Sequence, residues 1–468
     1  MRNRFVALAL AAASCVSIGA RPVRAQVPAA GARDDSLHLT LASSLRRARS
    51  LSTEVLVAGD SLSLSGVRVL EAYGAFLPAV TAGAAGLSAQ GTTFLSGTAL
   101  RAAQAGWYSA QYEVSTALNI FNGFRDRAAL RSSSFLNEAA TFSLEQAKQH
   151  ISLDVLQSYF QVVLDHQLIA VAQSNLSTSQ ARQARLEGQV QVGTRSPPDL
   201  FRQQAQTAQD QSTVIDADAR AQTDLVSLLR RLRLEATRDY TVEDPPMDTV
   251  ALPSDSLDRN RLVARALGGR PDLHAAESRA SAADAAITQA TGEYLPQVVL
   301  GADLGVFGRN YEWERVNGVS QLNESQRALG SQLTSQPLGV ISLGVVWPVF
   351  DRYATKFDVE RARATSHVAT LAAEDARLQV LGDVRQATDD YGAAVEKLRA
   401  SDAELASARE AFDAVSARFD VGLGIFLDVQ AAQTALADAQ AKNAAAAVNL
   451  MLRRQVLRYV TGTPLTAP

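Results

Sequence analysis

The sequence contains a long internal duplication, and this feature restricts the possible folds more than any other. Val192-Gly193 recurs 229 positions later as Val421-Gly422, with further matches on both sides at the same offset. An earlier pair of motifs, Phe76-Leu77-Pro78 and Tyr294-Leu295-Pro296, is separated by 218 positions. The second copy has therefore gained 11 residues between these landmarks, and such an insertion belongs in a loop.

Each copy is expected to contain a helix, two strands with a polar loop between them, and two long helices. We expect a signal segment over 1–25, a first repeat over 26–250 with strands 78–88 and 111–121 and long helices 127–190 and 198–235, and a second repeat over 251–468 with strands 295–305 and 338–349 and long helices 353–421 and 426–460. The stretches between paired strands, 89–110 and 306–337, are polar and are expected to be irregular loops outside the cell.

The expected strands alternate between apolar and polar residues, which gives each strand one apolar face. In the second strand Tyr112, Val114 and Leu118 alternate with Glu113 and Ser115. A soluble sandwich shows the same period, but aromatic residues near the strand ends favour a membrane barrel with aromatic girdles. These aromatic residues are Trp107, Tyr108, Tyr112, Phe121, Tyr294, Trp347 and Phe350.

The long helices carry a seven-residue repeat that predicts a left-handed coiled coil. Val384, Tyr391, Leu398, Leu405, Phe412 and Phe419 follow one another at this spacing. Glycines and prolines interrupt the helical pattern at 193–198 and 422–424, which predicts a reversal of the chain between two antiparallel helices.

The first residues are typical of a secretory signal, because a basic start precedes an apolar stretch and a small-residue cleavage site before Gln26. Cys15, the only cysteine, lies in this segment, so the exported chain is expected to lack disulfides and cysteine-based metal or catalytic sites. A lipid anchor at Cys15 is disfavoured by the preceding Ala12-Ala13-Ser14. The net charge of −3 becomes more negative once the arginine-rich segment is removed, which argues against nucleic acid as a partner.

Four strands cannot close a membrane barrel, because the smallest outer-membrane barrels use eight strands and an open edge in lipid leaves backbone groups unpaired. Copies of the chain must therefore join. Two copies supply eight strands, and three supply a ring of twelve that is wide enough for water. A water-filled channel therefore needs the twelve strands of three copies.

The landmarks of both halves resemble those of the TolC-type outer-membrane efflux proteins over nearly the whole mature chain. They are Leu39-Thr40-Leu41, Arg270-Pro271-Asp272-Leu273, Tyr294-Leu295-Pro296, Trp347-Pro348-Val349-Phe350-Asp351 and Arg418-Phe419-Asp420-Val421-Gly422. The resemblance implies an α+β membrane protein: a homotrimer whose four strands per chain form one twelve-stranded β-barrel, continued by an α-helical coiled-coil barrel across the periplasm. It also implies a passive channel of an efflux or type I secretion system, which exports small molecules or proteins from an inner-membrane pump through a periplasmic adaptor. No cofactor and no enzymatic activity are expected.

The two helical reversals are candidate contacts for the adaptor, as in similar proteins. Their residues are Val192, Gly193 and Thr194 in the first half, and Val421, Gly422 and Leu423 in the second. A small apolar knob on a tight turn can enter a groove between partner helices. The alternative is a plain turn in which glycine relieves backbone strain.

Several charged residues near these reversals are candidates for the periplasmic aperture. Threefold symmetry would repeat Asp428 as a ring of carboxylates, which selects cations; it can equally be a first-turn aspartate that stabilises a helix start, and we prefer this role for Asp199. Relatives in drug efflux can carry an arginine and a second aspartate where this chain has Gly424 and Ala431. Arg195 is therefore expected to pair with Asp428 or Asp420 and hold the mouth shut.

Two other classes of protein share features with this sequence. A coiled-coil adhesin or envelope tether explains the long helices and the signal segment, but not the two strand pairs at matching places. Gly59-Asp60-Ser61-Leu62 matches a motif of one esterase family, but the Asp-x-x-His that such enzymes carry late in the chain is missing. The five histidines are widely spaced, which argues against a metal site, and the sequence does not identify the cargo.

Overall fold

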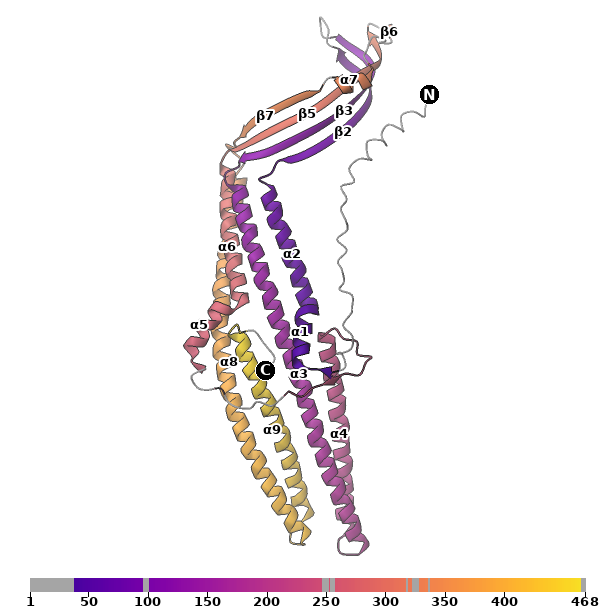
Figure 1. The fold of residues 1–468 in the computed structure, drawn as a ribbon, viewed down its shortest axis with the longest axis vertical. Coiled ribbons are helices and arrows are strands. Elements are labelled where there is room, and N and C mark those ends of the chain that lie inside the picture. The colour runs from indigo at the N-terminus through magenta and orange to yellow at the C-terminus, as the bar shows by residue number, and fades with distance from the viewer. Residues whose placement is uncertain are drawn as a thin grey trace.

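The computed structural model describes residues 38–95, 101–245, 252, 257–316, 319–321, 328–335 and 337–463; the expected signal segment 1–25 lies outside them. The molecule is long, with a β-sheet at one end, helices along its length and two helical reversals at the far end (Figure 1). Among the described helices, none is both long enough and apolar enough to cross a membrane.

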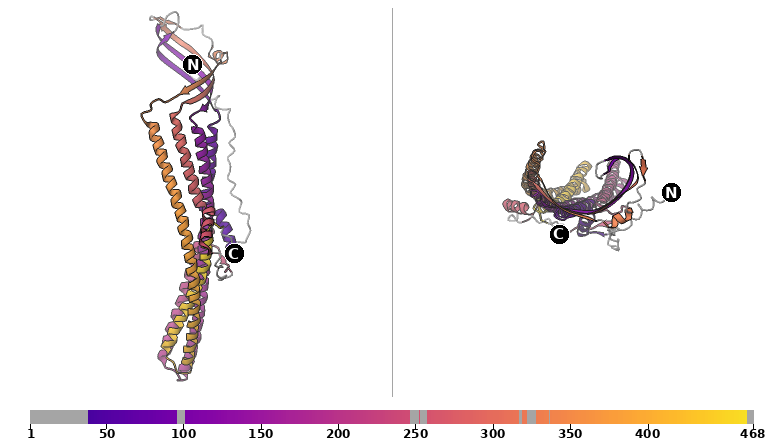
Figure 2. Two further views of the ribbon diagram at one scale, coloured as in Figure 1. Left: turned by 90° about the vertical axis from the view of Figure 1, so that its left-hand side faces the viewer. Right: turned by 90° about the horizontal axis from the view of Figure 1, so that it is seen from above.

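Four helices run side by side below the sheet and form a single layer (Figure 2). In spatial order they are α2 (Thr53–Gly74), α3 (Arg125–Gln191), α6 (Pro271–Thr291) and α8 (Ala354–Asp420). α3 and α8 have 67 residues each, which corresponds to a length of about 100 Å. Each therefore reaches from the sheet to the far end of the molecule (Figure 1).

The lower part of the molecule consists of two antiparallel helical hairpins (Figure 1). α3 packs on α4 (Pro197–Arg231), and α8 packs on α9 (Phe426–Val460). The residues of the seven-residue repeat from Val384 to Phe419 are buried or half-buried along α8, as the coiled-coil pattern predicts. Contacts between α3 and α9 join the two hairpins.

The sheet combines both repeats in one antiparallel order, β2-β3-β5-β7. Its strands are β2 (Ala79–Leu95), β3 (Arg101–Phe121), β5 (Gln297–Val316) and β7 (Leu338–Val346), with short β6 (Val319–Gln321) beside the end of β5 and helix α7 (Leu329–Ser335) packed against β5. The pairing of β3 with β5 unites the repeats, and the sheet is curved when viewed along the helices (Figure 2). The four strands expected for each chain are thus present.

β2, β3 and β5 are longer than expected, so the expected loops 89–110 and 306–337 are wrong in large part. β2 and β3 remain paired through the first stretch, from the pair Ala89–Trp107 to the pair Leu95–Arg101. β5 continues to Val316, and residues 317–318, 322–327 and 336 of the second stretch lie outside the described residues. Small and polar residues do not produce a clear alternation of apolar and polar side chains, yet their backbones form the same hydrogen bonds between strands. Strand lengths inferred from that alternation are therefore too short where such residues predominate.

Several element boundaries differ from the expected ones for local reasons. The single helix expected to open each repeat is two helices: α1 (Leu41–Leu51) before α2, and α5 (Arg259–Gly269) before α6. Ser52 breaks the first with an extended backbone and caps α2, and Arg270 is held extended by the following proline. α4 ends at Arg231 rather than 235, because Arg233 adopts a positive φ of 53°. β7 ends before Pro348, which lacks an N–H donor.

Both repeats turn from strand to long helix in the same way. Phe124 and Tyr353 have positive φ angles of 65° and 67° just before α3 and α8. The side chain of Asn122 accepts a hydrogen bond from the N–H of Asp126 at 3.4 Å, and Asp351 accepts one from Thr355 at 2.7 Å. The duplication seen in the sequence therefore extends to the caps of the helices.

A small second sheet packs against α3, apart from the main sheet. β1 (His38–Leu39) and β4 (Thr241–Val242) form a two-stranded parallel sheet against α3. The hydroxyl of the buried Tyr159 lies 3.1 Å from the carbonyl oxygen of Leu39 and 2.5 Å from that of Glu243, so it ties both strands to α3. Burial, reinforced by the charges of Glu243 and Asp244, raises the pKa of Tyr159, which keeps this hydroxyl protonated and able to donate.

Candidate functional site

The two helical reversals have the same backbone structure. Gly193 and Gly422 have φ angles of +75° and +81°, in the left-handed region that favours glycine. Behind them, the N–H of Thr194 donates to the carbonyl of Gln189 at 2.9 Å, and the N–H of Leu423 donates to Arg418 at 2.8 Å. Each long helix therefore ends in the glycine-containing C-cap that the sequence pattern predicts.

The side chains beside these glycines are apolar and exposed. Val192, Val421 and Leu423 are each about three-quarters exposed, at 74%, 72% and 75%. Ile425 and Leu427 continue this apolar surface onto the start of α9. Both tips thus present apolar side chains that nothing in the described chain covers, which is the geometry of a contact surface.

Arg195 does not pair with Asp428 or Asp420 within the chain, contrary to the sequence-based expectation. Its guanidinium donates to the carbonyl oxygen of Phe419 and lies over the Phe419 ring, with Cζ 4.1 Å from the ring centroid. Arg195 therefore links the first tip to the second by a backbone bond and a cation–π contact.

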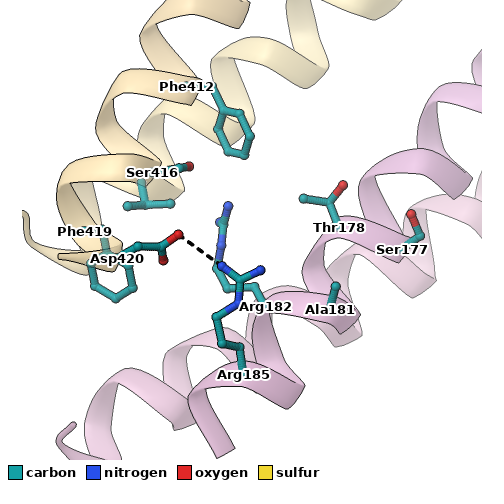
Figure 3. Close-up of a pocket in the computed structure, with 10 residues that line it drawn as sticks. Ser177, Thr178, Ala181, Arg182, Arg185, Phe412, Ser416, Phe419 and Asp420 are labelled. Atoms are coloured by element: carbon teal, nitrogen blue, oxygen red, sulfur yellow. Dashed lines mark hydrogen bonds and ion pairs between the residues drawn. The ribbon is translucent and has the colours of Figure 1, made fainter. Parts of the chain in front are cut away.

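Asp420 is instead paired with Arg185, a residue that the sequence analysis did not single out. Nη1 of Arg185 on α3 lies 3.1 Å from Oδ2 of Asp420 at the end of α8, and the pair bridges the two hairpins (Figure 3). The two side chains are 61% and 48% exposed, so solvent weakens their attraction.

Arg182 lies one turn above Arg185 and reaches into a cavity of about 330 Å³ between the hairpins (Figure 3). Its Nη1 donates to Oε1 of Gln433 at 2.6 Å, and its Cζ is 5.3 Å from the centroid of the Phe412 ring. Burial lowers the pKa of Arg182, although the charge of Asp420 opposes this shift. The spacing of Arg182 and Arg185 places both on one helical face, a signal that could have identified them.

The two remaining aspartates of the predicted aperture occupy first turns of helices. Asp199 lies in the first turn of α4, is half-buried and is 3.7 Å from Arg202 on its own helix. Asp428 lies in the first turn of α9 and is exposed, and its carboxylate has no partner among the described residues. The structure therefore brings Arg195 and Asp420 to the junction of the two tips, together with Arg182 and Arg185, and leaves the Asp428 carboxylate free.

The family model described as "Outer membrane efflux protein" matches residues 44–232 and 262–463, which are the two repeats. The chain belongs to the outer membrane efflux protein family. This membership places it in the outer membrane, with the helical part as a periplasmic tunnel.

Two curated proteins are similar in sequence, both described as "Pyoverdine export outer membrane protein OpmQ". The Pseudomonas putida protein is 25% identical over 340 residues, which are 72% of this chain and 65% of the relative. The Pseudomonas aeruginosa protein is 24% identical over 346 residues, 74% of this chain and 66% of the relative. The match thus spans slightly less than two thirds of each relative.

Solved structures of outer-membrane channels share the fold. The channel OprN superposes with a TM-score of 0.75 at 23% identity, covering 91% of this chain and 90% of that one. VceC of Vibrio cholerae gives 0.74 at 18% identity, with 90% and 96% covered. CusC gives 0.77 at 15% identity, with 91% and 92% covered. At these identities the likeness establishes the architecture alone.

Proposed function

We propose that three copies of this chain form a passive duct through the outer membrane that exports small molecules from an inner-membrane pump through a periplasmic adaptor. The observation that carries this proposal is that the sheet of the single chain ends in two unpaired edge strands. Within the described sheet, β2 is paired only with β3, and β7 only with β5. In lipid each such edge must find another strand, because its backbone groups have no water to bind.

The helical layer has two open edges of its own. α2 forms one edge and α8 the other (Figure 2). Both edges carry exposed large apolar side chains: Leu56, Val57, Leu64, Val67 and Leu70 on α2, and Phe357, Val368, Leu371 and Leu378 on α8. Apolar surface of this extent on a helix favours burial against another copy.

Two different edges that meet head to tail generate a ring, provided that the rotation between copies closes. The curvature of the sheet supports closure (Figure 2). Three copies give twelve strands and an interior wide enough for water, whereas two copies give eight strands and an interior that side chains fill. The trimer is therefore the assembly that can conduct.

The tips are proposed to form the periplasmic mouth of this duct. The ion pair of Arg185 with Asp420 and the stacking of Arg195 on Phe419 hold the two hairpins of one chain together. Threefold repetition would bring three Asp428 carboxylates near the axis, where they favour cations over anions. The exposed Val192, Val421 and Leu423 are the proposed contacts for the adaptor.

The proposed cargo class is small molecules, since two relatives are named for pyoverdine export. The channel is proposed to have no catalytic role. Ser61 of the esterase-like motif lies on α2, where its hydroxyl donates to the carbonyl of Val57 at 2.9 Å. Hydrolysis of a test ester that is lost in Ser61→Ala would contradict this part of the proposal.

Planar-bilayer recording tests the function. The purified protein is expected to insert and give discrete ionic currents that are larger for cations than for anions. A tether or adhesin gives no current, so an electrically silent bilayer with verified insertion of the protein would refute the duct.

A further inference from the structure

The α3–α4 hairpin contains two polar layers that lie two heptads apart. In the lower layer the hydroxyl of Ser179, which is 0% exposed, donates to Oδ2 of Asp210. Gln206 donates to the other oxygen, Oδ1 of Asp210, at 2.8 Å. Both carboxylate oxygens of Asp210 thus accept a hydrogen bond from a side-chain donor, so this layer is satisfied.

The upper layer has an acid where the lower layer has a serine. α3 and α4 run antiparallel, so a step of 14 residues from Ser179 to Asp165 corresponds to the step from Asp210 to Asp224. This register places Asp224 of α4 in the same layer as Asp165 of α3. Two acceptors therefore meet where the lower layer has a donor and an acceptor.

Asp165 has one oxygen satisfied and one without a protein donor. Gln161 donates to its Oδ1 at 3.2 Å, whereas its buried Oδ2 has no partner within the described part of the chain. The residue is only 4% exposed. A buried acceptor in this position is costly unless a proton is supplied.

The surroundings do not supply enough positive charge to replace that proton. Asp216 and Arg220 of α4 and Asp438 of α9 line a cavity of about 290 Å³ beside Asp165. His166, the next residue on α3, is turned to Asp244, with 3.1 Å between its Nδ1 and Oδ1 of that aspartate. Burial and the adjacent Asp224 raise the pKa of Asp165 to about 6, against smaller opposing effects of Gln161 and His166.

We propose that one proton shared between Asp165 and Asp224 holds α3 against α4, and we call this shared proton the clasp. The hairpin is then more stable in acid and becomes less stable when the proton dissociates. This proposal adds a pH-sensitive element to the tunnel wall, well above the tips. The clasp itself depends only on the fold, and its effect on current rests on the proposed channel function.

The sign of the effect follows from proton linkage. The carboxyl of Asp165 ionises near pH 3.8 when unfolded and near pH 6 when folded, so the folded chain binds more protons between these values. Stability contributed by this group is full below about pH 4 and is lost as the pH rises through 6. Between pH 5 and pH 7.5 the folding equilibrium constant should fall about tenfold per copy on this account.

The test compares the wild-type trimer with Asp165→Ser, which copies the Ser179–Asp210 layer, and with Asp210→Asn as a control that leaves the upper layer intact. Infrared difference spectra should show a protonated carboxyl in wild type and D210N at pH 5 that disappears near pH 6 and is missing in D165S. Thermal unfolding of wild type and D210N should weaken from pH 5 to pH 7.5 relative to D165S.

Wild-type and D165S proteins that share one pH profile, or a wild-type spectrum without a protonated carboxyl at pH 5, would overturn the clasp. If D165S does not assemble, Asp224→Asn provides the same comparison, and the wild-type spectrum alone still decides. A bilayer without current refutes the duct and leaves the spectroscopic result standing, so the two failures can be told apart.

Discussion

At the residue scale, the contacts between the two tips replace the ones that the sequence suggested. The motif positions 192–194 and 421–423 were predicted correctly as reversals, because glycine with a positive φ has a clear sequence signal. The partners of Asp420 and Arg195 were not, because a pairing across 224 or more residues depends on how two hairpins pack. The local sequence pattern therefore predicts where the chain reverses, whereas the packing of the two hairpins determines which residues pair across them.

Removal of the Arg185–Asp420 pair is expected to loosen the mouth. An exposed pair of this kind contributes about 0.2–1 kcal/mol, so Arg185→Ala should raise the open population about 1.5- to 5-fold per copy. The open probability of single channels in planar bilayers is the measurement. Arg202→Ala is the matched control, since Arg202 pairs within its own helix; an equal open probability in R185A and wild type would show that this ion pair does not hold the mouth closed.

Gly123 is expected to be irreplaceable at the junction between sheet and helix. Its φ is +69°, and a Cβ there would lie 2.2 Å from the carbonyl oxygen of Gly292 in the other repeat. Gly123→Ala should therefore destabilise the fold by at least about 1–3 kcal/mol. Gly188→Ala, in α3 with open space around it, should be neutral or stabilising. Thermal unfolding of both variants tests this, and equal midpoints would contradict it.

At the scale of elements, the sequence predicted which helices and strands exist better than where they stop. The long helices match to within a few residues, because their seven-residue repeat is strong. The lengths of β2 and β3 were underestimated, because β2 and the start of β3 consist largely of small and polar residues. The breaks that separate α1 from α2 and α5 from α6 depend on single caps and one proline, which a periodic pattern does not register.

The start of α6 is held to α8 by one buried arginine. Arg270 is 9% exposed at its side chain, with Nε 2.9 Å from Oδ1 of Asp272 and Nη1 2.7 Å from Oδ2 of Asp383. Burial by itself would raise the pKa of Asp272, but the bonds from Arg270 outweigh it and hold that pKa below 3.8. This pairing explains why the Arg270-Pro271-Asp272 motif opens the second repeat.

Arg270→Ala is expected to cost about 3 kcal/mol near neutral pH, because it leaves two partly buried carboxylates unpaired. The folded pKa of Asp272 is depressed, so the stabilisation is present above its ordinary value and is lost as the pH falls through the folded value. The cost should thus shrink below about pH 4. Chemical unfolding at pH 7 and pH 3.5 measures it, with the exposed Arg259→Ala as control; a cost that is independent of pH would contradict this role.

At the scale of the whole molecule, the duplication predicted the architecture because each repeat leaves one strand edge and one helical edge open. β2 with α2 lies on one side and β7 with α8 on the other. Twofold repetition inside the chain and threefold repetition between chains would then give a continuous wall. Cargo choice has no comparable signature in the described residues, because a water-filled duct makes few specific contacts.

The number of copies in the detergent-solubilised assembly is the most direct measurement of this account. Native mass spectrometry of the intact protein should give three chains per particle, and dissociation should yield unstable single chains. A stable, water-soluble monomer would contradict the account, because it would mean that the open edges of one chain need no neighbour.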